Sequence, residues 1–270
     1  MFSCPDLRRP AIELPDWLCQ AWPPIQRVIQ VECNGRQSVP LPRLADASVL
    51  FPLLERFAEL YPGIKRPPVA SQWSMNYLSV LLPATLAAVL TRDMTIAFWD
   101  QDVTLLHDAG QPMALKVPHE LAVLAAEQRA EYWSRLMQEH LEPLFKTLAL
   151  WGGLAPKVLW GNVVGVWDGA FSRLDGSLTR EGFAEAHRWL EQAVVADGRL
   201  KLRSLQWMVE SPAPDVCASI PLRRHCCLHY QLHAPVAGKP QVLCESCPKL
   251  HRLPQAEQAS YLRSIYLGES

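Results

Sequence analysis

The sequence predicts an α+β protein that is predominantly helical, with a small antiparallel sheet and a cysteine-rich segment near the C-terminus. Charge-poor stretches with apolar residues at helical spacing, beginning with residues 71–91, predict the helices. Short apolar segments between residues 95 and 117 predict the sheet. Four cysteines within residues 226–247, two of them adjacent, mark the third part of the chain.

The composition is that of a globular protein. The 270 residues are 49% apolar, which is enough to bury a substantial core, and the formal net charge is −1. We expect three regions: residues 1–68 as a proline-rich arm with a short helix, residues 69–215 as a mainly helical body with the small sheet, and residues 216–270 as the cysteine segment with a terminal helix. Eleven of the 23 prolines fall in the first region, which predicts irregular structure there, interrupted by a short element at 46–61.

The first long helix is expected to lie inside the protein. Residues 71–91 contain a run of fourteen uncharged residues, from Tyr77 to Leu90, with Pro83 in its middle. The run is too short to cross about 30 Å of hydrocarbon at about 1.5 Å per residue. We therefore predict a buried helix, kinked or broken at Pro83, and no transmembrane span.

Further elements follow from turn and capping signals. Residues 95–98 and 103–106 are expected to pair as a hairpin around Asp100 and Gln101, with residues 113–117 as another strand. Helices are predicted at 120–151, ending at Gly152 and Gly153, then from Pro156, at 183–196 after Thr179, and at 254–267. Glycines recur every four residues in the helix after Pro156, which predicts a flat packing face formed by Gly161, Gly165 and Gly169.

The clustered cysteines are the strongest functional signal. Cys226 and Cys227 are adjacent, and Cys244 and Cys247 follow as a Cys-x-x-Cys clip before Pro248. Thiolates bind iron–sulfur clusters and zinc, and four of them can complete a coordination sphere. An adjacent pair is not a zinc knuckle, which favours a two-iron cluster over zinc, although Cys-x-x-Cys also occurs in zinc and redox sites.

The remaining cysteines carry a different expectation. No secretory signal is visible at the N-terminus, so a reducing cytosol is expected and disulfides are improbable there. The isolated cysteines are predicted to be packing residues; they are Cys4, Cys19, Cys33 and Cys217.

With these residues in view, the chain resembles the FhuF-type siderophore-iron reductases. The stretch from Arg223 to Leu232, followed by residues 244–248, is similar to the C-terminal cysteine signature of that family. Leu159-Trp160-Gly161-Asn162 and Ser71-Gln72-Trp73 are similar to two other family segments. The resemblance implies that Cys226, Cys227, Cys244 and Cys247 bind a [2Fe–2S] cluster.

The sequence departs from the family in one place. Sixteen residues separate Cys227 from Cys244, where the family pattern has ten. The entropy of closing a loop grows slowly with its length, so six extra residues cost only about 0.4 kcal/mol. We expect residues 234–240 to form an exposed, turn-rich excursion.

The cysteines lie in a basic stretch. Residues 221–252 carry a net charge of +4, with Arg223, Arg224, Lys239, Lys249 and Arg252 against Glu245. A solvated surface is the ordinary explanation for such a run. Beside an anionic cluster, the cations would raise its reduction potential or attract an acidic electron donor such as a ferredoxin. The run is short and lacks a nucleic-acid-binding motif, so a nucleic-acid partner is not expected.

Several enzyme classes are excluded by missing motifs. The glycines form neither a dinucleotide-binding fingerprint nor a P-loop, and the hydrolase elbow and the His-Glu-x-x-His helix are also absent. Electrons are therefore expected to come from a partner protein or a diffusible carrier. The resemblance implies one-electron reduction of siderophore-bound ferric iron, of the hydroxamate class, in the cytoplasm or at the inner-membrane surface. It also suggests substrate contacts for Arg223, Arg224, Trp160 and Asn162, each with a structural alternative.

One rival remains open. A zinc-stabilised module that binds siderophores or proteins without redox activity would use the same thiols. His225, His229 and His233 are spaced four apart and would share one helical face, so a mixed Cys/His site is conceivable.

Overall fold

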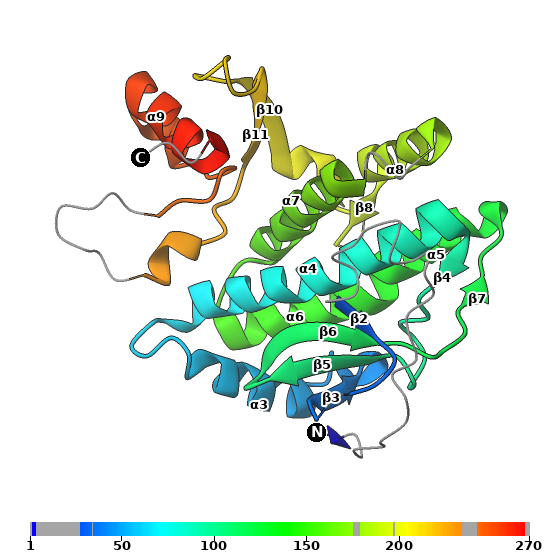
Figure 1. Cartoon of the computed structure of the whole chain (residues 1–270). Helices are drawn as coiled ribbons and strands as arrows, with labels where there is room; N and C mark the ends of the chain where they lie inside the picture. Colours follow the sequence, from blue (N-terminus) through cyan, green and yellow to red (C-terminus); the bar gives the residue numbers. More distant parts are fainter. Residues whose placement is uncertain are drawn as a thin grey trace.

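The protein, described here by a computed structural model, is predominantly helical with small, mainly antiparallel sheets, as the sequence predicts. The structure describes residues 2–3, 28–33, 35–174, 179–196, 198–233 and 242–267. The expected excursion at 234–240 lies outside these residues. Figure 1 shows α4 in the middle of the molecule, with the main sheet and α3 on one side and α7 on the other.

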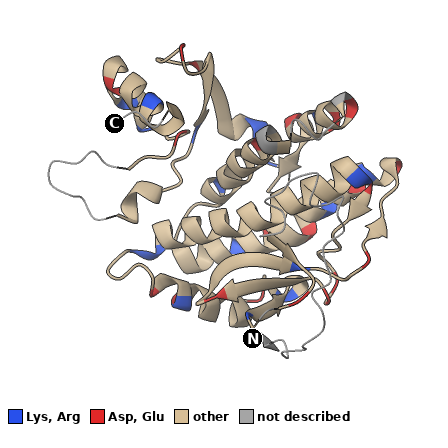
Figure 2. Cartoon of the chain, viewed as in Figure 1, with Lys and Arg blue, Asp and Glu red and all other residues tan. Residues whose placement is uncertain are grey.

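Helix α4 (Arg66–Arg92) is the structural centre of the protein. It begins with prolines at its first turn and ends at Asp93 in the left-handed conformation, a normal helix stop. Charged residues lie only at its two ends (Figure 2), and its middle packs against α7, α6 and β6. The helix continues through Pro83, so of the two outcomes expected there, a kink or a break, the break is wrong. By length and composition α4 could cross a membrane, but 78% of its most apolar window is buried within the protein, as expected of a core helix.

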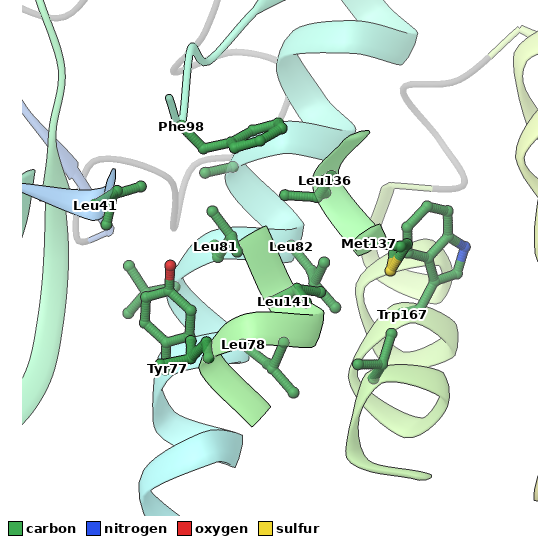
Figure 3. Packing of buried hydrophobic residues seen from close by; sticks show 14 of the residues in the cluster. Leu41, Tyr77, Leu78, Leu81, Leu82, Phe98, Leu136, Met137, Leu141 and Trp167 are labelled. Atoms are coloured by element: carbon green, nitrogen blue, oxygen red, sulfur yellow. The ribbon is translucent and has the colours of Figure 1, made fainter. Parts of the chain in front are cut away.

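The second helical layer contains a π-helical segment. Helix α5 (Arg129–Arg135) runs into the π-helix Leu136–Leu141 and then into α6 (Glu142–Gly152). Gly153 ends α6 in the left-handed conformation, which confirms the predicted stop. Figure 3 shows side chains of the π-helix packed among those of α4 and α7. The predicted start of this helix at residue 120 is wrong, because Ala122–Val123 form strand β7.

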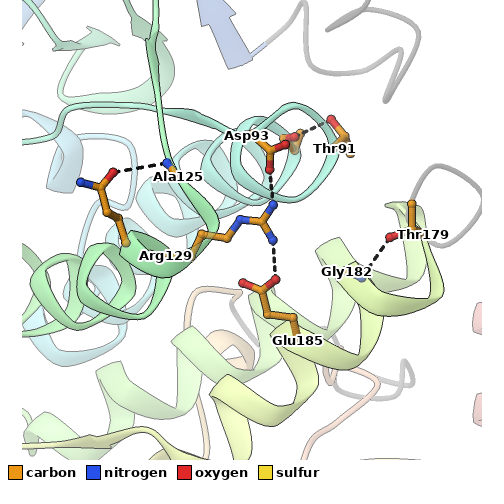
Figure 4. Close-up of polar contacts among 9 residues, drawn as sticks. Thr91, Asp93, Ala125, Arg129, Thr179, Gly182 and Glu185 are labelled. Atoms are coloured by element: carbon orange, nitrogen blue, oxygen red, sulfur yellow. Dashed lines mark hydrogen bonds and ion pairs between the residues drawn. The ribbon is translucent and has the colours of Figure 1, made fainter.

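Two more helices complete the main body. Helix α7 (Pro156–Leu174) begins at the proline that the sequence indicated, and α8 (Arg180–Gln192) is capped by Thr179, which accepts a hydrogen bond from Gly182 N at 3.0 Å. Arg129 pairs with both Asp93 and Glu185, and so joins the end of α4 to α8 (Figure 4).

In the described residues the main sheet has five strands, in the order β1-β3-β5-β6-β2. Its pairings are antiparallel except β2 with β6. The strand bounds are β1 Phe2–Ser3, β2 Ile29–Gln30, β3 Gln37–Pro40, β5 Thr104–Asp108 and β6 Gln111–Lys116. Helix α3 (Ala47–Ala58), within the short element expected at 46–61, lies beside this sheet.

The predicted hairpin around Asp100 is wrong. The observed hairpin joins β5 to β6 through Ala109 and Gly110, which both have positive φ angles, of 45° and 80°. Such angles suit a tight turn between antiparallel strands. β4 (Met94–Thr95) pairs instead with β7. Residues 96–103, between β4 and β5, form a loop.

The C-terminal part has its own small core. Strands β10 (Gln206–Glu210) and β11 (Ser219–Arg223) form a hairpin, and α9 (Gln255–Leu267) lies beside it (Figure 1). A separate apolar cluster includes Ile220, Leu222, Leu250 and Leu262. Short strands β8 (Val194–Val195) and β9 (Leu200–Lys201) precede it. The expected regional boundaries fall inside α4, at 68/69, and between the paired strands β10 and β11, at 215/216.

Candidate functional site

The four clustered cysteines lie together in the structure. Each thiol contacts two of the others, and the sulfur atoms of Cys227 and Cys244 are 3.5 Å apart. Cys227 and Cys247 are buried, whereas Cys226 and Cys244 are partly exposed. Residues separated by up to 21 positions in the chain therefore form one four-thiol site that reaches the surface.

Local backbone geometry brings the thiols together. Leu228 adopts a left-handed conformation, with φ 64°, directly after the adjacent pair, and its N–H lies 3.4 Å from the Cys226 sulfur. Residues 226–228 lie outside any strand, so the two neighbouring side chains are not held on opposite sides as they are in an extended chain. In the clip, Cys247 N donates to Cys244 O at 3.0 Å, which closes a tight turn.

The thiols influence one another's protonation. Hydrogen bonds from Cys226 and Cys244, together with the positive charge of Arg223, lower the pKa of Cys227 far below its usual value. Hydrogen bonds from the same two thiols also lower the pKa of Cys247. The pKa values of Cys226 and Cys244 are raised, first by these shared hydrogen bonds and then by burial. Two of the four sulfurs are therefore stabilised as thiolates, the form that binds metals.

A buried polar network connects both cysteine segments to the helical body. Arg223 is 4% exposed; its backbone N–H and its Nε both donate to Ser246, at 3.0 Å each. Its Nη1 donates to Asn162 Oδ1 at 2.5 Å. Asn162 Nδ2 donates to Ser71 Oγ at 3.2 Å, and Ser71 Oγ donates to Cys227 O at 2.6 Å. The network therefore links α4, α7, the adjacent cysteine pair and the clip.

The charge of Arg223 has no carboxylate partner among the ion pairs of the described residues. A buried cation without a counterion is strongly destabilising. The thiolates are the neighbouring anions, since the charge of Arg223 contributes to the lowered pKa of Cys227 and partly offsets the rise in the pKa of Cys244. Arg223 is thus placed to neutralise negative charge on the sulfurs.

The site fits a cluster in the chemistry of its donors. Four thiols and a buried cation suit an anionic, thiolate-ligated group. Within the described residues, no set of three or more His, Cys, Asp or Glu side chains is arranged to hold a metal ion. The thiols contact one another here, so they would have to move apart to admit a cluster.

The four residues suggested as substrate contacts differ in position. Trp160 and Asn162 are 1% and 0% exposed, and Trp160 packs edge-on against Phe145. Arg223 is also buried, so in this structure all three contact protein groups. Arg224 is exposed and lies over the ring of Trp207, at 5.1 Å.

Sequence reasoning did not assign a site role to Ser71 or Ser246. Ser71 lies in a segment that carried the family resemblance, and Ser246 lies inside the clip, so both were marked by their positions. Nothing in the pattern showed that their hydroxyls would meet the same arginine–asparagine pair.

His225, His229 and His233 do not share a helical face, because the left-handed Leu228 and a short 3-10 helix at His229–Gln231 interrupt the segment. The His229 ring instead contacts Gln72 Oε1, at 2.9 Å.

The isolated cysteines also differ from one another. Cys217 is a free thiol packed against the C-terminal apolar cluster, as expected. Cys33 is buried against Leu106 and Ala114, as expected of a packing residue, but it is also disulfide-bonded, so the expectation that disulfides are improbable is wrong. Cys4 and Cys19 lie outside the described residues.

The packing face predicted for the glycines is present only in part. A methyl group on Gly165 would collide with the Arg223 guanidinium, whereas one on Gly161 or Gly169 would meet nothing within 4 Å. Of these three glycines, only Gly165 has a close neighbour, and that neighbour is the charged side chain of Arg223. No backbone packs closely along all three glycines, as the prediction required.

The fold and the site define a helical protein with a four-thiol centre joined to its core by a buried arginine. The family described as ferric iron reductase FhuF-like transporter matches residues 71–211, which is more than half of the chain. The chain belongs to this FhuF-like ferric iron reductase family. The match begins at Ser71 and ends before Arg223, so it is independent of the cysteines. No curated protein matches the chain.

Proposed function

We propose that this protein reduces ferric iron bound by a hydroxamate siderophore, with Cys226, Cys227, Cys244 and Cys247 holding a [2Fe–2S] cluster. The convergence of the four thiols beside the buried Arg223 is the observation that carries the proposal. When bound, such a cluster would supply one-electron transfer at an accessible potential.

The protein's own residues would hold and tune the site. Arg223 would neutralise thiolate charge and, through Ser246, fix the clip. Ser71 would anchor the carbonyl of Cys227 to α4. Because cations and hydrogen-bond donors stabilise the more negative reduced state, this environment would raise the reduction potential.

Reduction explains iron release. The substrate Fe(III) gains one electron, which the donor supplies, and becomes Fe(II). Hydroxamate oxygens are hard ligands, which bind the more highly charged Fe(III) more strongly, so the chelate weakens and the iron dissociates. The hydroxamate class and release in the cytoplasm rest on the family resemblance.

The electron donor is proposed to be an acidic redox protein of the ferredoxin kind. The pKa of His225 is lowered mainly by burial, and further by the positive charges of Lys157 and Arg224. Three basic groups therefore lie close together beside the cysteine pair. Such a surface would attract an acidic partner at low ionic strength. We also propose that the protein makes peripheral contact with the inner membrane, where imported ferric chelates arrive.

Anaerobic purification and single-turnover reduction test the function. We expect iron and acid-labile sulfide in equal amounts, visible absorbance, and an EPR signal after dithionite reduction. Reduced protein freed of dithionite should then transfer electrons to ferric hydroxamates, measured with an Fe(II)-trapping dye. Stoichiometric zinc without sulfide would instead favour the zinc-stabilised module without redox activity. An intact cluster that reduces no ferric chelate would refute the proposed reductase activity.

A further inference from the structure

A cavity of about 560 Å³ lies apart from the four-thiol site. Residues 35–37 line one wall, Arg56 and Glu59 at the end of α3 line a second, and residues 107–109 at the end of β5 line a third. Its volume is typical of small-molecule sites. None of its lining residues takes part in the network around the cysteines.

The cavity contains buried polar atoms without partners. His107 is 1% exposed, and within the described part of the chain neither of its ring nitrogens has a hydrogen-bond partner. Nη1 of Arg36 is also buried, and no described residue accepts a hydrogen bond from it. Nearly all buried polar groups in proteins are hydrogen-bonded. Two such residues in the wall of one cavity indicate that a polar ligand completes it.

The backbone beside these groups is irregular. The pairing of β5 with β6 shifts between Leu106 and His107, as in a bulge that redirects a side chain. Ala109 has a φ of 45°, an uncommon value for a residue other than glycine. Gly110 follows, where a side chain would collide with the carbonyl oxygen of Leu53 in α3. Bulges and strained residues of this kind are found at binding sites more often than elsewhere.

The protonation state of His107 defines what it can bind. Burial, followed by the charge of Arg56, lowers the pKa of His107 to about 4. At pH 7 the ring is therefore neutral, with one N–H donor and one nitrogen acceptor. A hydroxyl group satisfies such a ring, because it both accepts and donates.

Arg36 completes the recognition set. Its buried Nη1 donates only, and a carboxylate is its natural acceptor. The acidic lining residues are Glu59 and Asp108. Both are exposed, so water solvates their negative charges without a ligand.

We propose that this cavity binds a small hydroxycarboxylate, with a carboxylate on Arg36 and the neighbouring hydroxyl on His107. This site is separate from the proposed reductase centre and does not depend on it. The ligand would supply the acceptor and the hydroxyl that the described residues do not provide.

Isothermal titration calorimetry of the 270-residue protein at pH 7 tests the site with malate and succinate, which differ by one hydroxyl. We expect malate to bind, and succinate to bind about tenfold more weakly through loss of the hydroxyl's hydrogen bonds. Arg36→Gln should weaken malate binding by at least the same factor. Arg43→Gln is the matched control, because Arg43 is exposed and pairs with Asp46 outside the cavity.

Other outcomes would overturn the proposal. Equal affinity for malate and succinate would show that His107 does not recognise the hydroxyl. Phosphate binding as tight as malate binding would show that the cavity is a general anion site. No measurable binding of malate at millimolar concentration would exclude the site. Unchanged thermal unfolding of Arg36→Gln ensures that its lost affinity is not a folding defect, and His107→Gln, which keeps a polar side chain, should bind malate and succinate alike.

Discussion

The hydroxyl of Ser71 donates a 2.6 Å hydrogen bond to the carbonyl oxygen of Cys227, 156 positions later in the chain. The same hydroxyl accepts a hydrogen bond from Asn162, which in turn accepts one from Arg223. The first residue of the family match is thus in contact with the cysteine segment that lies beyond the match. The helical body and the thiol site are therefore parts of one structure.

Serine substitutions at the four clustered cysteines should reduce iron and sulfide content, because each removes one soft ligand. The assay is iron and sulfide analysis of anaerobically purified protein, with the visible spectrum. Cys217→Ser is the control, since Cys217 is a free thiol outside the four-thiol contact. Full cluster content in Cys226→Ser or Cys244→Ser would remove that residue from the ligand set.

Arg223→Met should lower the reduction potential of the site and its cluster content. The substitution removes the cation beside the thiolates and leaves Asn162 Oδ1 and Ser246 Oγ without their donor. One tenfold change in the one-electron equilibrium corresponds to about 59 mV, and a decrease of that order is expected in potentiometric titration. Arg224→Met is the comparison, because Arg224 is exposed and stacks on Trp207. Equal potentials in the two variants would show that the buried charge has no special effect.

Gly165→Ala and Gly169→Ala should have opposite effects on stability. A methyl at Gly165 would collide with Arg223, and overpacking of this kind costs about 1–3 kcal/mol. A methyl at Gly169 meets nothing, and alanine stabilises a helix by about 0.5–1 kcal/mol relative to glycine. Urea unfolding of both proteins measures the difference. Similar stabilities would mean that Arg223 does not occupy the space beside Gly165.

The stability of the protein should fall in mild acid because of His140. Burial lowers the pKa of His140 to about 4, from an ordinary value of 6.5, and its Nε2 is hydrogen-bonded to the buried Tyr77 hydroxyl. Between these pH values the unfolded chain binds more protons than the folded protein. The free energy of unfolding therefore decreases as the pH falls from 6.5 towards 4, by about 3 kcal/mol for this histidine.

The pH effect can be isolated by substitution. In His140→Gln the loss of unfolding free energy over that pH range should be smaller than in the natural protein, whatever the absolute stability of the variant. Urea unfolding at several pH values gives both curves. Parallel curves would show that His140 does not titrate in this range.

The sequence predicted elements well where local chemistry governs them. Pro156 begins α7, Thr179 caps α8 and Gly153 ends α6, because each residue favours its backbone conformation by itself. Prediction failed where distant segments decide the pairing. The sequence offered residues 95–98 and 113–117 as partners for β5. The structure pairs β5 also with β3, which lies in the region expected to be irregular.

The four thiols, their spacing and the family resemblance were evident from the sequence alone, since soft ligands are identified by residue type. Only the tertiary structure showed that Arg223 is buried, with no carboxylate partner among the residues described. It also showed that Arg223 fills the space beside Gly165 and that Ser71 anchors Cys227. Burial and partner choice depend on contacts between residues far apart in the chain. Residue type states which interactions a side chain can make, and the folded packing decides which of them it does make.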